Sequence, residues 1–386
     1  MHTVLCVYGT RPEAIKIAPI VRALNESRDF TAVVAVTGQH REMLDQVNEL
    51  FSIVPQYDLD IGRTGQSLND ILVRALRGLA PVLESVRPDV VMVQGDTSSA
   101  FAAAIGAFHA GIPVVHVEAG LRTFDLSSPW PEEGNRQLIS RLASLHFAPT
   151  IASKRNLLAE NIQSDHVIVT GNTVIDALLW TTARSTVWRD DRIRSIVARD
   201  DEILLVTTHR RESWGAPMVR IAQALDRLAT DLPGIQIVVP VHRNPLVRDT
   251  LLQVLQRREN VTIVEPLDYD QFAGLMKRSR VVLTDSGGVQ EEAPSLGKPV
   301  LVMRENTERP EAVDAGTVKL VGTGIEEIYA SVTELWTQPA AYRRMASAVN
   351  PYGDGRAAGR VVAGLRRFFG SGEEVEEFTP SEREPL

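Results

Sequence analysis

Residues 4–20 read VLCVYGTRPEAIKIAPI, and this stretch sets a pattern that the rest of the chain repeats. The run Val4–Tyr8 is rich in β-branched residues and predicts a buried strand. After Gly9, Pro12 suits a first helical position, and the apolar residues beyond it have helical spacing. A strand that passes through a short glycine turn into a helix is the start of a β-α-β unit. The stretch therefore predicts a parallel α/β fold.

The same alternation of strand and helix continues in two series. The strands expected in the first series are Val4–Tyr8, Ala32–Thr37, Val90–Gln94, Val114–Val117, Leu145–Ala148 and Val167–Val169. Those expected in the second series are Ile203–Thr207, Ile235–Pro240, Val261–Val264, Val281–Thr284 and Val300–Val302. We therefore expect two doubly wound, Rossmann-like domains, over residues 1–170 and 171–355.

The C-terminal part of the sequence changes character. Residues 356–369 have amphipathic spacing and predict a helix, which either closes the second domain or crosses back onto the first. Residues 371–386 contain six acidic residues, one basic residue and two prolines, so we expect a disordered tail.

Composition narrows the class of protein. The 386 residues are 44% hydrophobic and 23% charged, which is typical of a globular protein. The net charge of −8 argues against a partner such as nucleic acid or an anionic membrane, so an anionic ligand needs a local site. The single cysteine, Cys6, lies in an apolar run and predicts a core residue. No secretory signal pattern is found at the N-terminus, and we expect a cytoplasmic protein.

Polar residues cluster directly after the predicted strands, where parallel sheets bind ligands. Arg11 and Lys16 lie on the first turns of the first helix, whose backbone N–H groups favour anions. Taken alone, this segment is also compatible with an ordinary surface helix. It predicts an anion-binding corner.

Three acidic residues follow the same logic. Asp96 comes after the strand Val90–Gln94, and Glu118 comes after Val114–Val117. Glu132 lies at a proline-flanked helix start, with Arg136 one turn further on. Each acid alone has a simple alternative as a helix cap or a solvated charge. Three converging acids favour proton-transfer chemistry.

The second half contributes a glycine turn. Ser286, Gly287 and Gly288 follow the strand Val281–Thr284 and open a helix. Two glycines let a backbone approach a ligand closely, and the helix start favours an anion such as a diphosphate. Glu292 lies about one turn further on, where its carboxylate can accept hydrogen bonds from sugar hydroxyls.

Cationic groups follow other strands of the second half. His209 and Arg210 come after Ile203–Thr207, His242 comes after Ile235–Pro240, and Arg309 follows the last predicted strand. Each of them taken singly is equally compatible with a solvated loop charge.

Common catalytic motifs are missing from the sequence. It has no G-x-x-x-x-G-K-[ST] phosphate loop, no G-x-G-x-x-G after the first strand, no H-E-x-x-H and no G-x-S-x-G. No pair of histidines or carboxylates has tight metal-ligand spacing, so we expect no metal site.

Eight segments together resemble the non-hydrolysing UDP-N-acetylglucosamine 2-epimerase family. They are GTRPEAIKIAPI, TGQHREMLDQV, QGDTSS, HVEAGLRT, SPWPEEGNRQLIS, THRRESWG, DSGGVQEEAPSLGKPVL and RENTERPEAV, within residues 1 to about 365. The resemblance implies the glycosyltransferase-B architecture, with a nucleotide sugar in a cleft between two Rossmann-like domains and a C-terminal helix returning to the first. It also implies a homodimer without a cofactor, acting in polysaccharide biosynthesis.

The implied reaction interconverts UDP-GlcNAc and UDP-ManNAc by anti elimination of UDP to 2-acetamidoglucal and re-addition. By resemblance, the catalytic positions are Asp96, Glu118, Glu132 and His209. The substrate-binding positions are Arg11, Lys16, Arg136, His242, Ser286, Gly287, Gly288, Glu292 and Arg309.

A regulatory UDP-GlcNAc pocket is also implied by some members of the family. Gln39, His40 and Arg210 match part of this pocket, but Glu42 and Gly65 stand where those members have Gln and Arg. The two departures argue against regulation by UDP-GlcNAc.

Three alternative functions share parts of this pattern. A UDP-sugar glycosyltransferase of the same architecture would use a similar diphosphate site, but it needs only one base. A hydrolysing epimerase would release free ManNAc, and a non-catalytic UDP-sugar sensor would tolerate loss of the acids. The trio of acids favours the reversible epimerase.

Overall fold

The computed structural model describes residues 1–38, 41–63, 65–232, 234–241, 244–307, 309–372 and 374–380, without the side chains of Glu42 and Arg211. These residues form two compact units. Unit 1 consists of Met1–Ala177 and Tyr352–Thr379, and unit 2 consists chiefly of Leu178–Pro351. Each unit contains one parallel sheet, so the predicted fold class of two Rossmann-like α/β units is confirmed.

The sheet of unit 1 has seven strands in the order β3-β2-β1-β4-β5-β6-β7. The strands are β1 (His2–Tyr8), β2 (Phe30–Val36), β3 (Tyr57–Asp58), β4 (Val90–Gln94), β5 (Val114–Val117), β6 (Leu145–Ala148) and β7 (Val167–Val169). All the neighbouring strands pair in parallel.

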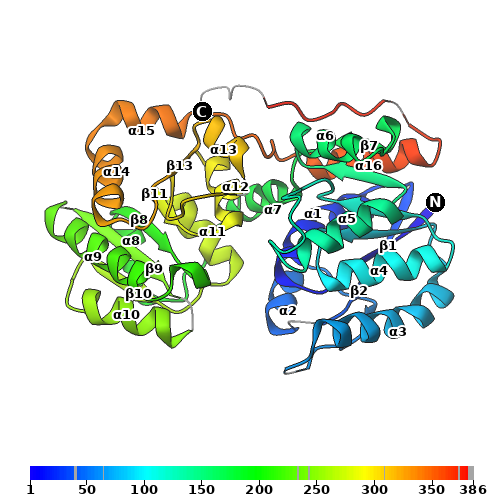
Figure 1. Ribbon diagram of the computed structural model, residues 1–386, viewed down its shortest axis with the longest axis horizontal. Helices are drawn as coiled ribbons and strands as arrows, with labels where there is room; N and C mark the ends of the chain where they lie inside the picture. The colour runs from blue at the N-terminus through cyan, green and yellow to red at the C-terminus, as the bar shows by residue number, and fades with distance from the viewer. Residues whose placement is uncertain are drawn as a thin grey trace. The chain divides into compact units, whose positions relative to one another are not determined.

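Helices cover both faces of this sheet (Figure 1). They are α1 (Arg11–Glu26), α2 (Arg41–Leu50), α3 (Leu68–Val86), α4 (Ser98–His109), α5 (Glu132–Leu142), α6 (Ile151–Ala159) and α16 (Ala357–Phe368), with a short 3-10 helix η1 (Ser164–His166). Helices α3, α4 and α5 pack in a row, as do α2, α1 and α16. Helix α7 (Thr173–Thr182) carries the chain out of unit 1.

The sheet of unit 2 has six parallel strands in the order β10-β9-β8-β11-β12-β13. The strands are β8 (Glu202–Thr207), β9 (Ile235–Pro240), β10 (Val261–Val264), β11 (Ser279–Thr284), β12 (Val300–Val302) and β13 (Val318–Leu320).

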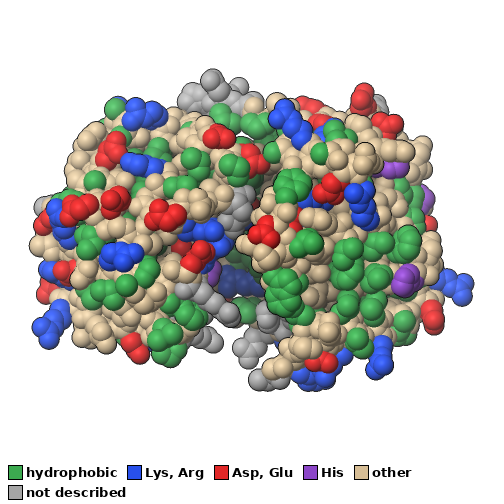
Figure 2. All heavy atoms as spheres, viewed as in Figure 1, with side chains coloured by type: hydrophobic (Ala, Val, Ile, Leu, Met, Phe, Trp, Pro, Cys, Tyr) green, Lys and Arg blue, Asp and Glu red, His purple; other side chains and the backbone are tan. Residues whose placement is uncertain are grey.

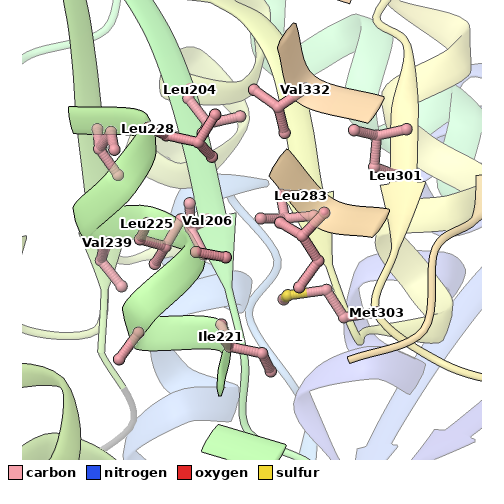
Figure 3. Packing of buried hydrophobic residues seen from close by; sticks show 14 of the residues in the cluster. Leu204, Val206, Ile221, Leu225, Leu228, Val239, Leu283, Leu301, Met303 and Val332 are labelled. Carbon is pink, nitrogen blue, oxygen red and sulfur yellow. The ribbon is translucent and has the colours of Figure 1, made fainter. Parts of the chain in front are cut away.

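The helices of unit 2 enclose a continuous apolar core. They are α8 (Asp191–Ala198), α9 (Ala216–Asp231), α10 (Pro245–Leu255), α11 (Tyr269–Arg278), α12 (Gly287–Ser295), α13 (Pro310–Asp314), α14 (Ile325–Thr337) and α15 (Pro339–Ala346), with a 3-10 helix η2 (Arg211–Ser213). Figure 3 shows Leu225 and Leu228 of α9 packed towards Leu204 and Val206 of β8. All four side chains are fully buried, which fixes α9 against the sheet.

The strand order of each sheet reverses at one point. In unit 1 the chain runs outward from β1 to β2 and β3, then returns to place β4 on the other side of β1. In unit 2 the same reversal lies between β8 and β11. Ligands of open parallel sheets bind beyond the carboxyl ends of the strands at such a switch point. A ligand site is therefore expected at the turns after β1, β4, β8 and β11.

The predicted strands agree closely with the observed ones. Strands β4, β5, β6, β7, β9, β10 and β12 have the predicted limits, and β1, β2, β8 and β11 differ by one or two residues at one or both ends. Strands β3 and β13 were not predicted, because one has two residues and the other carries Lys319 within three. Cys6 is fully buried, as expected.

The end of the chain differs from the expected disordered tail where it is described. Phe378 is 3% exposed, and its backbone N–H donates to the carbonyl of Val169 at 2.8 Å. Glu377 forms an ion pair with Lys154 at 2.7 Å. Two apolar side chains among the acidic residues, Val375 and Phe378, supply burial that the charge pattern alone does not reveal.

Surface charges are mixed on the face that Figure 2 shows, where basic and acidic side chains alternate over unit 2. An anion would therefore be held by local groups. No helix among the described residues is long and apolar enough to cross a membrane.

Candidate functional site

Unit 1 gathers four of the predicted site residues into one group at its switch point. Lys16 of α1, Asp96 after β4, Glu118 after β5 and Arg136 of α5 form this carboxylate cluster. The side chains of Lys16 and Glu118 are 15% and 8% exposed. Their attraction is therefore stronger than that of a surface ion pair.

Glu118 is the most constrained member of the cluster. Its Oε1 accepts from Lys16 Nζ and, at 3.0 Å, from Asn172 Nδ2, while its Oε2 accepts from Gln94 Nε2. The residue also has a left-handed backbone, with φ at 63°. Such a conformation is uncommon outside glycine and asparagine, and it concentrates at functional sites. The surrounding contacts therefore hold a carboxylate in a defined position at a cost in backbone energy.

Asp96 lies beside Glu118 and is clamped by an arginine. Arg136 donates through Nε at 2.9 Å and through Nη2 at 2.5 Å to the same oxygen, Asp96 Oδ2. Burial raises the pKa of Asp96; Arg136 opposes this rise, and the nearby Glu118 carboxylate adds to it. Two acids in different environments at one site suit opposite roles in proton transfer.

A buried acid, Glu13, stabilises the turns that carry the carboxylate cluster. Glu13 is 2% exposed and accepts hydrogen bonds from Thr10 and, at 2.5 Å, from Thr97, the residue after Asp96. Burial raises the pKa of Glu13, against these hydrogen bonds. Glu13 therefore ties the turn after β1 to the turn after β4. The sequence pattern Thr10-x-x-Glu13 is a capping box, which was the available signal for this residue.

A second buried acid, Glu133, organises the approach to α5. Its carboxylate accepts from the backbone N–H groups of Thr123 at 3.0 Å and Phe124 at 3.1 Å. Asn135 Nδ2 donates to the carbonyl of Asp96 at 2.9 Å, which joins α5 to the turn after β4. Glu133 and Asn135 were not predicted from the sequence, because their partners Thr123 and Asp96 are distant along the chain.

Glu132 and Arg11 are half-buried at helix starts. Glu132 is the first residue of α5, and Arg11 is the first residue of α1. Neither side chain forms a hydrogen bond or ion pair with the residues that the structure describes. Both are therefore available for a ligand.

The candidate site of unit 2 surrounds the glycine turn, Ser286–Gly288, at the start of α12. A Cβ at Gly287 would lie 2.5 Å from Arg309 Nη1, so the guanidinium lies directly against this glycine. Arg309 is held in place by Glu291, whose Oε1 accepts from Nε at 2.6 Å. A helix start, a glycine and a fixed arginine form a suitable anion site.

Glu292 lies one turn along α12 and is 6% exposed. Its Oε1 accepts from the hydroxyl of Tyr269 at 2.8 Å, which fixes the orientation of the carboxylate. A fixed carboxylate beside an anion site can accept from the hydroxyls of a sugar.

His209 and Arg210 are anchored by a fully buried acid that sequence reasoning did not single out, Asp285. The backbone N–H groups of His209 and Arg210 both donate to Asp285 Oδ2 at 3.0 Å, and the Thr208 hydroxyl donates at 2.9 Å. His209 Nδ1 lies 3.2 Å from Asp285 Oδ1. Burial would raise the pKa of Asp285, but these hydrogen bonds hold it below its usual value. The turn after β8 is therefore tied to the glycine turn after β11.

Three predicted residues, Gln39, His40 and His242, lie outside the described residues. The two departures from the regulatory pattern, Glu42 and Gly65, belong to helix α2 and to a turn before α3.

Each unit thus has its own candidate site at its switch point: buried acids with cations in unit 1, and a glycine turn with a fixed arginine in unit 2. The fold defines a two-unit Rossmann-like protein of the glycosyltransferase-B class, and the glycine turn of unit 2 is a candidate anion site.

Comparison with known proteins assigns the family. The model of the UDP-N-acetylglucosamine 2-epimerase family matches residues 22–366. The UDP-N-acetylglucosamine 2-epimerase of Escherichia coli K12 is 54% identical over 370 residues, 94% of this chain and 98% of that protein. The chain belongs to the UDP-N-acetylglucosamine 2-epimerase family.

Solved structures of relatives contain nucleotide ligands. The UDP-GlcNAc 2-epimerase of Neisseria meningitidis, bound to UDP-GlcNAc, is 49% identical with a TM-score of 0.86, over 95% of this chain and all of that one. The Methanocaldococcus jannaschii enzyme, in complex with UDP-GlcNAc and UDP, is 33% identical with a TM-score of 0.78, over 95% and 99%.

Proposed function

We propose that this protein interconverts UDP-GlcNAc and UDP-ManNAc without hydrolysing the nucleotide sugar. The observation that carries the proposal is the carboxylate cluster, in which Asp96 and Glu118 lie side by side at the switch point of unit 1. The named activity of relatives that are about half identical supports the same substrate.

The chemistry of C2 explains why two acids and an anion site are needed. The hydrogen on C2 is not next to a carbonyl, so simple deprotonation would leave an unstabilised carbanion. Departure of UDP from C1 accepts the electrons, and it leaves 2-acetamidoglucal. Re-addition of UDP, with the proton delivered to the opposite face, gives the epimer. Atoms and charge balance without a redox cofactor.

The residues of unit 1 have roles in proton transfer. Glu118 is held as a carboxylate by Lys16 and two amides, which suits a base. Burial favours the protonated form of Asp96, which suits an acid. Glu132 is a third acid with no partner among the described residues, available for the sugar hydroxyls.

The residues of unit 2 bind the leaving group. The glycine turn and Arg309 stabilise the diphosphate as its charge develops, and Glu292 binds the ribose. His209 assists at the departing phosphate, supported by Asp285. Arg11 and Arg136 of unit 1 are further cations, for which the resemblance implies a role in substrate binding, and the homodimer implied by the resemblance stays a prediction.

The product distinguishes this function from its alternatives. Purified protein is incubated with UDP-GlcNAc, and the products are separated by ion-exchange chromatography and identified by NMR. We expect an equilibrium mixture of UDP-GlcNAc and UDP-ManNAc. Free ManNAc with a stoichiometric amount of UDP would indicate a hydrolysing enzyme. Turnover only with an added acceptor would indicate a glycosyltransferase.

A further inference from the structure

The chain has one segment that leaves unit 1 and one that returns to it, which we call the two crossings. Asn172 lies where these two segments meet. The chain leaves unit 1 after Ala177 and returns to it at Tyr352. Asn172 comes just before helix α7 on the outward path, and its backbone N–H donates to the carbonyl of Tyr352 on the return path at 2.6 Å. The side chain of Asn172 is buried, with the residue 3% exposed.

Among the described residues, Glu118 and Val174 form hydrogen bonds of opposite kind with the side chain of Asn172. Its Nδ2 donates to Glu118 Oε1 at 3.0 Å, and its Oδ1 accepts from the backbone N–H of Val174 at 3.1 Å. The reverse orientation of the amide would place its oxygen against a carboxylate and its NH2 group against an N–H donor. The two partners therefore fix which end of the amide faces Glu118.

The crossings are packed too closely for the asparagine to move independently. A Cβ at Gly171 would lie 3.3 Å from the Cα of Gly353, so the two glycines permit a direct backbone contact. Asp176 strengthens this contact, because its carboxylate accepts from the backbone N–H groups of Ala357 and Ala358 at the start of α16. The position of Asn172 is thus set by the paired crossings.

We propose that Asn172 is a positioning residue for Glu118, which ties the orientation of that carboxylate to the two crossings of the chain. Gln94 donates to one oxygen of Glu118 and Asn172 to the other, so two rigidly held amides define the plane of the carboxylate. The flexible Lys16 cannot do this alone. The proposal rests on the proposed function, because it assigns Asn172 to the base of that reaction.

The simpler role for Asn172 is a cap of helix α7 through its Oδ1. Asn172→Asp separates the two roles, because a carboxylate still accepts from Val174 N–H and the backbone hydrogen bond to Tyr352 is unchanged. The substitution replaces the donor to Glu118 by an oxygen that repels its carboxylate. The matched control is Asn260→Asp, which removes a partly buried donation of the same kind, from Nδ2 to the carbonyl of Ala229 at 2.9 Å in unit 2.

The first experiment measures kcat and KM for UDP-GlcNAc over a range of pH. For Asn172→Asp we expect kcat to fall by roughly 10- to 100-fold at about pH 8, with little change in KM. The loss should shrink at low pH, where the new carboxyl is protonated and can donate again. Asn260→Asp should keep the wild-type kcat. A wild-type kcat for Asn172→Asp, or an equal loss for both variants, would overturn the proposal.

A second experiment does not depend on activity. In the double variant Asn172→Asp with Glu118→Gln, the new amide at position 118 can donate to the new carboxylate at position 172. We expect its melting temperature to exceed that of Asn172→Asp alone by roughly 2–6 °C. No recovery would mean that the two side chains are not coupled, and would overturn the proposal. A wild-type protein that fails to epimerise, with the stability coupling intact, would instead overturn the proposed function alone.

Discussion

Replacement of Asp285 by Asn should destabilise the protein far more than its modest chemical change suggests. Asp285 is fully buried, and its carboxylate accepts from the backbone N–H groups of His209 and Arg210 and from the hydroxyls of Thr208 and Ser213. Hydrogen bonds to a charged acceptor contribute about 1.5–3 kcal/mol, against about 0.5–1.5 kcal/mol for neutral pairs. Four weakened bonds, offset by the easier burial of an amide, give a loss of about 3 kcal/mol.

Thermal denaturation of Asp285→Asn tests this estimate. A loss of about 3 kcal/mol corresponds to a decrease in Tm of roughly 6–12 °C for a unit of this size. Burial alone would raise the pKa of Asp285, but the His209 side chain and the backbone N–H groups of His209 and Arg210 lower it overall, so this stabilisation is present above the unfolded value of 3.8 and is lost as the pH falls below it. The decrease in Tm should therefore be largest near neutral pH and shrink in acid.

Asp190→Asn is the matched control. Asp190 also accepts several hydrogen bonds, from the backbone N–H groups of Arg192 and Ile193 and from the Arg192 side chain, but its side chain is 23% exposed at the start of α8. Asn is an equally good cap, so we expect a loss below about 1 kcal/mol. Equal decreases in Tm for the two variants, or a decrease below about 2 °C for Asp285→Asn, would refute the reasoning.

The site and its surroundings give three further predictions. Glu118→Gln and Asp96→Asn should each lower kcat by roughly 100-fold or more with a smaller change in KM, as steady-state kinetics will show; a change in KM alone would make them binding residues. Burial raises the pKa of Asp176 to about 6 from 3.8. The free energy of unfolding should therefore fall by about 3 kcal/mol as the pH rises through that interval, because the unfolded state releases its proton first. The Tm of Asp176→Asn should lack this dependence between about pH 4 and 6, and parallel pH profiles for the two proteins would contradict it. The resemblance implies that Glu42 and Gly65 weaken phosphate contacts of a regulatory pocket, so we expect UDP-ManNAc freed of UDP-GlcNAc to be epimerised without a lag; a lag that a trace of UDP-GlcNAc relieves would show that the regulatory site is intact.

Local sequence signals predicted the strands and the position of most site residues, because an apolar run marks a parallel strand and the polar residues directly after it mark a ligand site. Asp96 and Glu118 could be located in this way, since each lies just beyond a strand of unit 1. The glycine turn could be predicted in the same way, because two glycines follow a strand and open a helix; the contact of Arg309 with Gly287 is seen only in the structure.

The supporting residues could not be predicted, because their partners are distant in the sequence. Asp285 anchors a turn more than 70 residues before it, and Asn172 reaches Glu118 across 54 residues. Neither side chain differs locally from an ordinary turn residue or helix cap. The buried contact of Phe378 with β7 spans a longer interval still. Such pairings depend on the tertiary fold rather than on the local pattern.

Transfer of solvent hydrogen to C2 of the sugar tests the central claim most directly. The protein is incubated with UDP-GlcNAc in D2O, and the isolated UDP-ManNAc is examined by proton NMR and mass spectrometry. Elimination and re-addition through the acids of unit 1 predict one deuterium at C2 in the product. UDP-ManNAc that retains the original hydrogen at C2 would contradict the mechanism, because the proton removed by Glu118 or Asp96 would not have exchanged with solvent.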